Sequence, residues 1–296
     1  MGKLQISTHG RLQEWIAHDK GYFSDEGLDY DFEVAFLEVG SELQRSADGA
    51  PTEYKEGAFE HYATGEHGKK GLSCACHWAV NEAAAEHRGG RMWGGAYSVI
   101  PCGVYVPPES AITKPEDLAG VEIAVGYHSG SHFATLQALE PFLDADQINL
   151  RFLGYPYDRV DLALDRQVPA LTAWGASTYV LEQQGFRKIT DGTFIGGFMF
   201  ADDIDPDDVE RYFGALKRAQ MDLDLAPERY KHYYLREVPE RFHALIDVRR
   251  FGPGERIVFL PYSAEMYEQS QEWLQERDLF PGGSAAPSRY ESVVKV

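Results

Sequence analysis

The chain has 296 residues, 44% of them hydrophobic, which is enough for a sizeable core and about two domains by the usual size relation. Its net charge of −19, from 47 acidic and 28 basic residues, repels phosphate backbones and excludes nucleic acid as a partner. The sequence has no apolar run of about 18 residues, so we expect no membrane span.

The cysteines and the first residues predict the cellular compartment. Three cysteines, an odd number, do not make a disulfide framework, and a reducing environment suits them. Residues 1–7, MGKLQIS, lack the basic start, apolar core and cleavage site of a secretory signal. We therefore expect a cytoplasmic protein.

Alternating and periodic apolar residues predict a first α/β block. Leu12, Trp15 and Ile16 mark one face of a helix that ends near residue 21. The strands expected in this block are residues 3–7, 29–36 and 92–106, with a further short buried strand that residues 70–71 lead into, followed by an Ala-rich helix at residues 79–85.

The pattern restarts after Pro107 and Pro108 and predicts a second block. Its expected strands are residues 121–125, 150–153 and 170–173, and its expected helices include one with Phe133, Leu136, Leu139 and Phe142 on one side. Residues 192–200 run extended again, the following segment is mainly helical, and residues after 281 read as a loose tail.

Two blocks joined by extended crossings near Val104 and Phe194 predict a two-lobed α/β protein with mostly parallel sheets and an interlobe cleft. We assign residues 1–105 and 195–280 to lobe 1, residues 106–194 to lobe 2 and residues 281–296 to a C-terminal tail. The sequence does not indicate the oligomeric state.

Cys74, Cys76 and His77 lie at an expected strand-to-helix corner, where α/β proteins bind ligands. A thiol becomes a nucleophile when a nearby imidazole or helix N-terminus favours its thiolate, so either cysteine is a candidate with His77 as base. Asn81, one helical turn further on, could orient His77. The alternative is that both cysteines are small core residues.

A metal site would need further ligands, such as His9 or His128, because Cys-x-Cys-His alone is a weak signal. We predict neither a metal nor a cofactor.

Residues 126–132, GYHSGSH, follow an expected strand and open a helix, so backbone N–H groups and hydroxyls there can hold an anion. His128 is a candidate general acid or base, with a surface histidine as the equal alternative. The residues expected to bind substrate are His9, Asn81, Tyr127, Ser129, Gly130, Ser131, His132 and Trp174. His9 and Trp174 each follow a strand at the cleft edge, where an indole suits a flat ligand.

Two longer stretches resemble a known family. Residues 18–28, HDKGYFSDEGL, resemble the first-helix signature of type II periplasmic binding proteins for aliphatic sulfonates and thiamine pyrimidine precursors. Residues 110–126, SAITKPEDLAGVEIAVG, resemble their entry to the second lobe, and the likeness covers roughly residues 3–275. The resemblance implies the type II periplasmic-binding-protein fold.

The same fold is similar to that of cytoplasmic enzymes: hydroxymethylpyrimidine phosphate synthase, an aryl-sulfinate desulfinase and aromatic-acid decarboxylases. The resemblance places the histidine that the synthase consumes on His77, but the synthase's pyridoxal-binding lysine falls on Ser73. The desulfinase's nucleophilic cysteine falls near Gly10, so that chemistry would have to move to Cys74 or Cys76.

We therefore expect a cofactor-free lyase that acts on a small anionic aromatic or heterocyclic molecule, with Cys74 or Cys76 as nucleophile and His77 or His128 moving the proton. The alternatives are a non-catalytic binding protein for such an anion, as a transporter component or intracellular sensor, and a structural or interaction protein.

Overall fold

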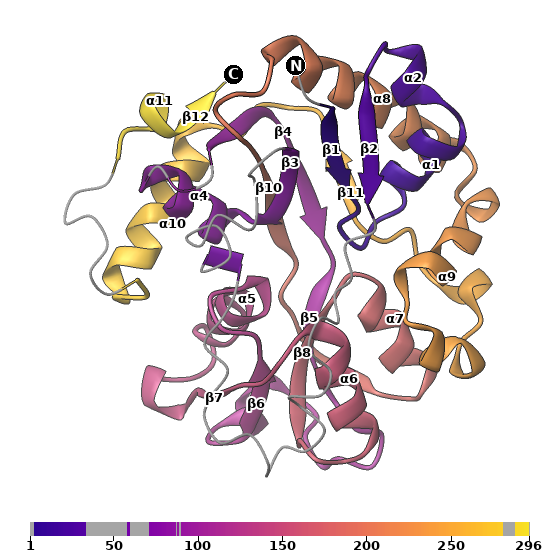
Figure 1. The fold of residues 1–296 in the computed structure, drawn as a ribbon. Coiled ribbons are helices and arrows are strands. Elements are labelled where there is room, and N and C mark those ends of the chain that lie inside the picture. Colours follow the sequence, from indigo (N-terminus) through magenta and orange to yellow (C-terminus); the bar gives the residue numbers. More distant parts are fainter. Residues whose placement is uncertain are drawn as a thin grey trace.

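The computed structural model describes residues 3–33, 58–59, 71–86, 88, 90–280 and 288–295. Its strands form two sheets, drawn above and below one another in Figure 1. The first sheet runs in the order β11 (Arg256–Val258), β4 (Arg91–Ile100), β10 (Phe194–Phe200), β3 (Gly71–Cys76), β1 (Leu4–Ser7) and β2 (Tyr30–Glu33). The second runs in the order β7 (Asn149–Phe152), β6 (Glu122–Val125), β8 (Ala170–Trp174), β5 (Cys102–Val106) and β9 (Arg187–Asp191).

Helices cover both sheets. Those that pack with the first sheet or with one another beside it are α1 (Gln13–Asp19), α2 (Tyr22–Asp25), α4 (His77–Ala85), α8 (Pro206–Leu225), α10 (Ala264–Glu276) and α11 (Tyr290–Val293). Those on the second sheet are α5 (Gly130–Leu139), α6 (Pro156–Leu164) and α7 (Ala176–Gln183). The short helix α9 (Tyr234–Glu237) lies among 3₁₀ turns at Pro227–Arg229, Lys231–Tyr233, Glu240–Leu245 and Val248–Arg250; others are Pro115–Leu118 and Ala145–Gln147.

The chain passes between the sheets twice, at Pro101 and at residues 192–193. The two passages lie together, because Ile100 pairs with Phe194 and the Gly192 N–H donates to the Cys102 carbonyl at 3.1 Å. Both sheets are mixed, whereas the sequence predicts mostly parallel pairing. The strands next to the passages return antiparallel: β10 against β3 and β4, and β5 against β8 and β9.

The chain end differs from the predicted loose tail. Residues 281–287 lie outside the described residues, but β12 (Val294–Lys295) pairs in parallel with Met92 and Trp93 of β4. Val293 and Val294 are buried, so apolar packing holds this segment on the first sheet. The expected strand at residues 29–36 is described only as far as Glu33.

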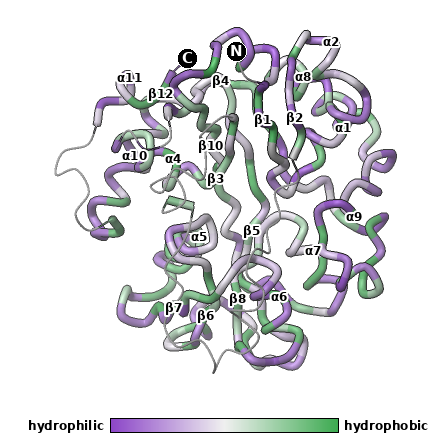
Figure 2. Tube along the Cα trace, in the orientation of Figure 1, coloured by the Kyte–Doolittle hydropathy of each residue, from purple (hydrophilic) through white to green (hydrophobic). Residues whose placement is uncertain are grey.

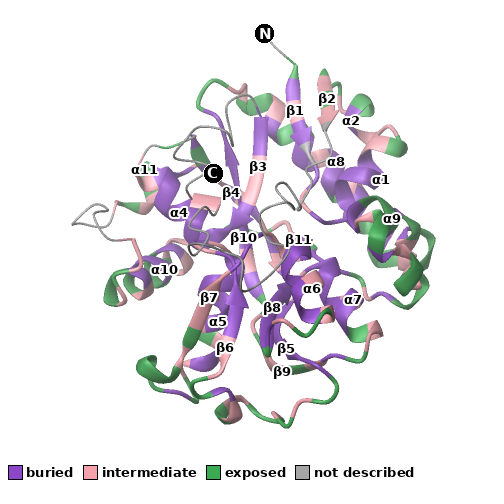
Figure 3. Ribbon diagram, turned by 60° about the horizontal axis from the view of Figure 1, so that its bottom comes forward, coloured by how far each residue is buried: buried purple, intermediate pink, exposed green. Residues whose placement is uncertain are grey.

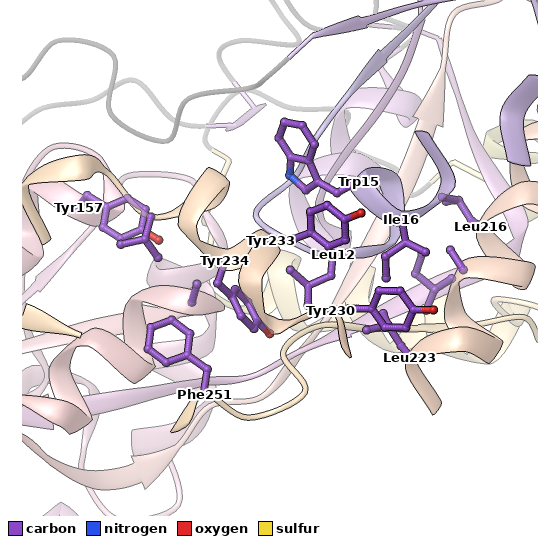
Figure 4. Packing of buried hydrophobic residues seen from close by; sticks show 14 of the residues in the cluster. Leu12, Trp15, Ile16, Tyr157, Leu216, Leu223, Tyr230, Tyr233, Tyr234 and Phe251 are labelled. Carbon is purple, nitrogen blue, oxygen red and sulfur yellow. The ribbon is translucent and has the colours of Figure 1, made fainter. Parts of the chain in front are cut away.

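The core follows the central strands. Figure 2 shows hydrophobic residues concentrated along them and hydrophilic residues on the outer helices and turns, and Figure 3 shows the same strands mostly buried. Around α1, Leu12, Trp15 and Ile16 pack among Tyr230, Tyr233 and residues of α8 (Figure 4). This packing confirms the predicted face of the first helix and fixes the chain that follows β1.

Within the described residues, none of the helices has the length and apolar character needed to cross a bilayer.

Candidate functional site

A buried charged cluster lies where β1 turns into α1. Gly10 adopts a left-handed φ of 72°, which a glycine takes without strain and which turns the chain into α1 within a few residues. His9 and Arg11 flank this glycine. With Glu14 of α1, Cys74 of β3 and Glu255 just before β11 they form what we call the Arg11 cluster.

Arg11 is the centre of the cluster and is 1% exposed. Its Nε donates to both carboxylate oxygens of Glu14 at 2.8 Å, and its Nη2 donates to the same carboxylate. Its Nη1 donates to Glu255 Oε1 at 2.7 Å and to Cys74 Sγ at 3.3 Å. Burial opposes the charge on the guanidinium, but Glu14, Cys74 and Glu255 outweigh that effect and raise the pKa of Arg11 further. The cluster therefore keeps a charged guanidinium against the sulfur.

His9 and Glu255 face each other at the edge of the cluster. His9 Nδ1 lies 3.6 Å from Glu255 Oε2, and the side chains are 18% and 1% exposed, respectively. Burial opposes the imidazolium, yet the negative charges on Cys74 and Glu255 raise the pKa of His9 to about 10. Burial alone would raise the pKa of Glu255, but Arg11 and His9 lower it to about 2. His9 is thus a cation that reaches the protein surface.

A glycine on β10 makes room for the sulfur. A Cβ on Gly196 would lie 2.3 Å from Ser98 Oγ, 2.9 Å from Ile100 Cδ1 and 3.5 Å from Cys74 Sγ. Since real Cβ atoms do not approach within about 3.0 Å of such neighbours, any other residue here would require the Ser98 and Ile100 side chains to move. The space beside Cys74 is therefore kept free of a side chain by the sequence of β10.

The second sheet reaches the Arg11 cluster through Trp174. The indole, at the end of β8, stacks on the His9 ring with a centroid separation of 5.7 Å and an interplanar angle of 20°. His9, Cys74 and Trp174 are all partly exposed. An imidazole, a thiol and an indole therefore meet at the boundary between the two sheets.

The predicted anion loop, residues 126–132, lies between β6 and α5 as expected. Ser131 Oγ accepts from the Gly126 N–H at 2.9 Å, and Ser129 Oγ donates to the Gly126 carbonyl at 2.7 Å. Gly130 sits against the Phe194 ring, so α5 begins beside β10. The serine hydroxyls shape the loop, and the first backbone N–H groups of α5 are donors that a helix leaves unpaired at its N-terminus.

Arg159 of α6 lies under this loop and is 2% exposed. Its Nη1 donates to the carbonyls of Leu153 and Gly154 at 3.1 and 2.5 Å, and its Nη2 lies 3.4 Å from Ser131 Oγ. Its Nε has no hydrogen-bond partner among the described residues, and burial lowers its pKa to about 10. A positive charge is thereby placed behind the anion loop.

His128 and its neighbours are less open than the sequence predicts. His128 is 5% exposed, adopts a φ of 38° and shares a 2.8 Å hydrogen bond with the Leu279 carbonyl through Nε2. The Tyr127 ring stacks on the His128 ring, with the ring centroids 3.8 Å apart. His132 is 6% exposed, and burial, assisted by His128, lowers its pKa to about 3. Tyr127 is the partly exposed aromatic residue of this group.

Cys76, His77 and Asn81 lie in the core instead of beside Cys74. Cys76 is 4% exposed, and burial raises its pKa to about 12. Burial lowers the pKa of His77 to about 3, and its Nδ1 shares a 2.9 Å hydrogen bond with the Tyr262 hydroxyl. Asn81 Nδ2 donates to the same hydroxyl at 2.9 Å and to Ser270 Oγ at 3.2 Å. This network joins α4 to α10 and to Tyr262, just before it.

Three members of the cluster were not singled out from the sequence. Arg11 and Glu14 have the spacing of an ordinary helical ion pair on the surface. Glu255 lies 244 residues from Arg11, in a segment without a motif. The sequence did offer one signal for Arg11 and Glu14. They lie beside the apolar face of Leu12, Trp15 and Ile16, and charged side chains that are buried with such a face must be paired.

No protein-family model and no curated protein matches the sequence. Solved structures do match over the whole chain. The alkanesulfonate-binding protein SsuA from Xanthomonas axonopodis pv. citri, bound to MOPS, is 16% identical with a TM-score of 0.71, covering 100% of this chain and 98% of that one. The desulfurization enzyme DszB is 14% identical with a TM-score of 0.62, covering 96% and 95%.

A Candida albicans protein, the CA3427 gene product, is described as having the generic periplasmic-binding-protein fold. It is 13% identical with a TM-score of 0.68, covering 100% of this chain and 96% of that one. The chain therefore has the periplasmic-binding-protein fold, as the sequence resemblance predicts. These similarities concern the fold, which hosts both binding proteins and enzymes.

Proposed function

We propose that this protein is a cytoplasmic, cofactor-free enzyme that binds a small anionic aromatic or heterocyclic molecule between its two sheets and cleaves it in a lyase-type reaction. The observation that supports the proposal most is the pairing of Cys74 Sγ with Arg11 Nη1 at 3.3 Å, beside His9. Thiols in electropositive, partly exposed surroundings are the reactive ones. Cys74 is partly exposed, receives the Arg11 hydrogen bond and lies beside the His9 cation, whereas Cys76 is buried.

Cys74 is the nucleophile in this proposal. A negative sulfur is stabilised by the hydrogen bond from Arg11, and Glu14 holds the guanidinium in place from its other side. Gly196 leaves space beside the sulfur. The nucleophile can therefore be approached without displacing a side chain of β10.

His9 supplies the proton. Its raised pKa keeps the ring cationic near neutral pH, and its exposed edge faces the boundary. With a sulfinate, the thiolate adds to the ligand's sulfur, the carbon–sulfur bond breaks and the carbon takes the His9 proton. The group held on Cys74 then leaves as sulfur dioxide, which restores the thiolate, and His9 takes a proton from solvent, which restores the imidazolium.

In this proposal the ligand is bound by residues of the second sheet and its helices, opposite Cys74 and His9. The first backbone N–H groups of α5, with Arg159 behind the loop, favour an acidic group. Trp174 offers a flat face to a ring. An anionic aromatic molecule satisfies both features.

The test uses chelator-treated protein in catalytic amounts, with aryl sulfinates, aromatic carboxylates and a metabolite extract, followed by mass spectrometry. We expect consumption in large molar excess by the wild type and by Cys76→Ser. Cys74→Ser should lose turnover and retain ligand binding. Full turnover by Cys74→Ser would overturn the proposal.

A non-catalytic role as an anion-binding protein or sensor is the second candidate, favoured by the similarity in fold to a sulfonate-binding protein over the whole chain. In that case a ligand is retained one to one and nothing is consumed. Cys74→Ser would then bind the ligand as the wild type does.

A further inference from the structure

Three side chains of the Arg11 cluster also have the chemistry of a metal site. One nitrogen of His9, the sulfur of Cys74 and a carboxylate oxygen of Glu255 all lie within 4.8 Å of one another. Imidazole, thiolate and carboxylate are the three ligand types that zinc uses in proteins. They come from three separate parts of the chain, namely the turn after β1, β3 and the segment before β11.

Two buried polar atoms of this group face each other as an ion pair and make no hydrogen bond within the described part of the chain. Among the described residues, neither His9 Nδ1 nor Glu255 Oε2 has a hydrogen-bond partner. The Glu255 side chain is 1% exposed, and a buried carboxylate oxygen without a hydrogen bond is unfavourable. The two atoms lie 3.6 Å apart, as expected for two ligands at about 2.0–2.2 Å from one tetrahedral ion.

Arg11 orients two of the three ligands. Its Nη1 binds Glu255 Oε1 at 2.7 Å, which leaves Oε2 as the free oxygen, and it contacts Cys74 Sγ at 3.3 Å. Outer-shell donors of this kind fix ligand geometry in metal sites. Glu14 neutralises the guanidinium, so a cation at the three ligands does not face an uncompensated positive charge.

The charges also agree with a divalent ion. Binding of a metal ion displaces the protons of its ligands, including the one that His9 carries. In that bound state the negative groups Glu14, Glu255 and the Cys74 thiolate outnumber the Arg11 cation by two. One divalent cation balances that difference. A thiolate and an imidazole select Zn²⁺ over the hard ions Mg²⁺ and Ca²⁺.

We propose that His9, Cys74 and Glu255 bind one Zn²⁺ with an open fourth position. A bound ion occupies the Cys74 sulfur and the His9 nitrogen. Cys74 then cannot act as the nucleophile and His9 cannot donate a proton, so Zn²⁺ should inhibit the proposed reaction. The metal site does not depend on that reaction and is tested without it.

The test titrates Co²⁺, a spectroscopic substitute for Zn²⁺, into the chelator-treated full chain and follows thiolate-to-cobalt charge-transfer absorption. We expect the band to saturate at one equivalent and to disappear when Zn²⁺ is added. Cys76→Ser and Cys102→Ser, which alter buried cysteines outside the cluster, should keep the band. Cys74→Ser should lose it.

His9→Gln, which alters the partly exposed ligand, should weaken Co²⁺ binding by at least about tenfold, the lower end of what even an outer-shell partner contributes. Far-ultraviolet circular dichroism shows that each variant is folded. Absence of the band from the wild type, or its persistence in Cys74→Ser, would overturn the assignment. Turnover of chelator-treated protein is a separate measurement, so failure of the metal site and failure of the proposed reaction are distinguishable.

Discussion

The His9 imidazole lies against the Trp174 indole, with ring centroids 5.7 Å apart and planes 20° from parallel. His9 follows β1 of the first sheet, and Trp174 ends β8 of the second. The two rings therefore join the sheets at the place where the reactive thiol is proposed to act. A cation on an aromatic face is a favourable contact when partly desolvated.

Removing the indole should weaken binding of an aromatic anion. An aromatic pair contributes about 0.5–1.5 kcal/mol beyond the area that it buries, and Trp174→Ala removes that area as well, so it should raise the ligand's dissociation constant by at least about two- to tenfold. Trp174→Phe keeps a flat face and should have a much smaller effect. Isothermal titration with the ligand identified in the turnover screen measures both. Equal affinities for wild type and Trp174→Ala would show that the indole packs on His9 between the sheets and does not contact the ligand.

Replacing Arg11 should strongly destabilise the protein. Arg11→Met leaves the Glu14 and Glu255 carboxylates buried without their cation, and breaking such a network costs about 3–5 kcal/mol. Urea unfolding measures the loss. The control is Lys3→Ala, which removes a pair with Asp31 in which both side chains are 51% exposed, and it should leave the unfolding midpoint unchanged. Similar midpoints for Arg11→Met and wild type would contradict charged carboxylates in the cluster.

Glu237 makes stability depend on pH. Burial is the largest cause that raises its pKa to about 7, from an ordinary value of 4.5. Between these values the folded protein holds a proton that the unfolded chain releases, so this residue's contribution to stability falls as the pH rises. Trp15 Nε1 donates to the Glu237 carboxyl, and a glutamine keeps that acceptor.

The free energy of unfolding of the wild type should therefore fall from about pH 5 to about pH 8, whereas that of Glu237→Gln does not carry this loss. The difference between the two should shift by about 2–3 kcal/mol in favour of Glu237→Gln over that range. Urea unfolding at both pH values gives the difference. Glu210→Gln, at an exposed position of α8, is the matched control and should follow the wild type. A constant difference between Glu237→Gln and wild type at the two pH values would contradict the raised pKa.

Tyr262 and Tyr267 offer a matched pair for the buried network of α4. Tyr262→Phe removes the hydroxyl shared by His77 and Asn81 and should lower the free energy of unfolding by about 1–3 kcal/mol. The Tyr267 hydroxyl is buried and has no hydrogen-bond partner among the described residues, so Tyr267→Phe should be neutral or stabilising. Thermal unfolding measures the stability of the two variants. Equal losses of stability would contradict a stabilising role for the hydrogen bonds of the Tyr262 hydroxyl.

Much of the fold could be predicted because local patterns reflect it. The apolar face of Leu12, Trp15 and Ile16 predicted α1, and the strand-to-helix corner at Cys76 and His77 is present. The sheet direction was harder, because nothing in the sequence of β10 shows that it returns antiparallel to β3. The end of the chain was misjudged since a two-residue strand such as β12 is too short to form a pattern.

The candidate site was only partly accessible from the sequence. Cys74, His9 and Trp174 were all singled out, but Cys74 was paired with His77, its neighbour in sequence. The structure instead places Cys74 beside Arg11, 63 residues away. Alternation along a strand separates Cys74 from His77, and which of the two meets a charge is decided by contacts between distant segments. Burial and pKa depend on those contacts and have no local signature.

The position of Glu255 and β12 in the chain has a consequence for how the protein is made. Arg11 and Glu14 leave the ribosome early, but the carboxylate that completes their network follows about 240 residues later, and β12 later still. The second sheet consists of strands within residues 102–191, so it can assemble while synthesis continues. Until then the edge of β4 that pairs with β11 and β12 stays uncovered and Arg11 lacks its second carboxylate, and an unpaired strand edge is a site of aggregation during folding.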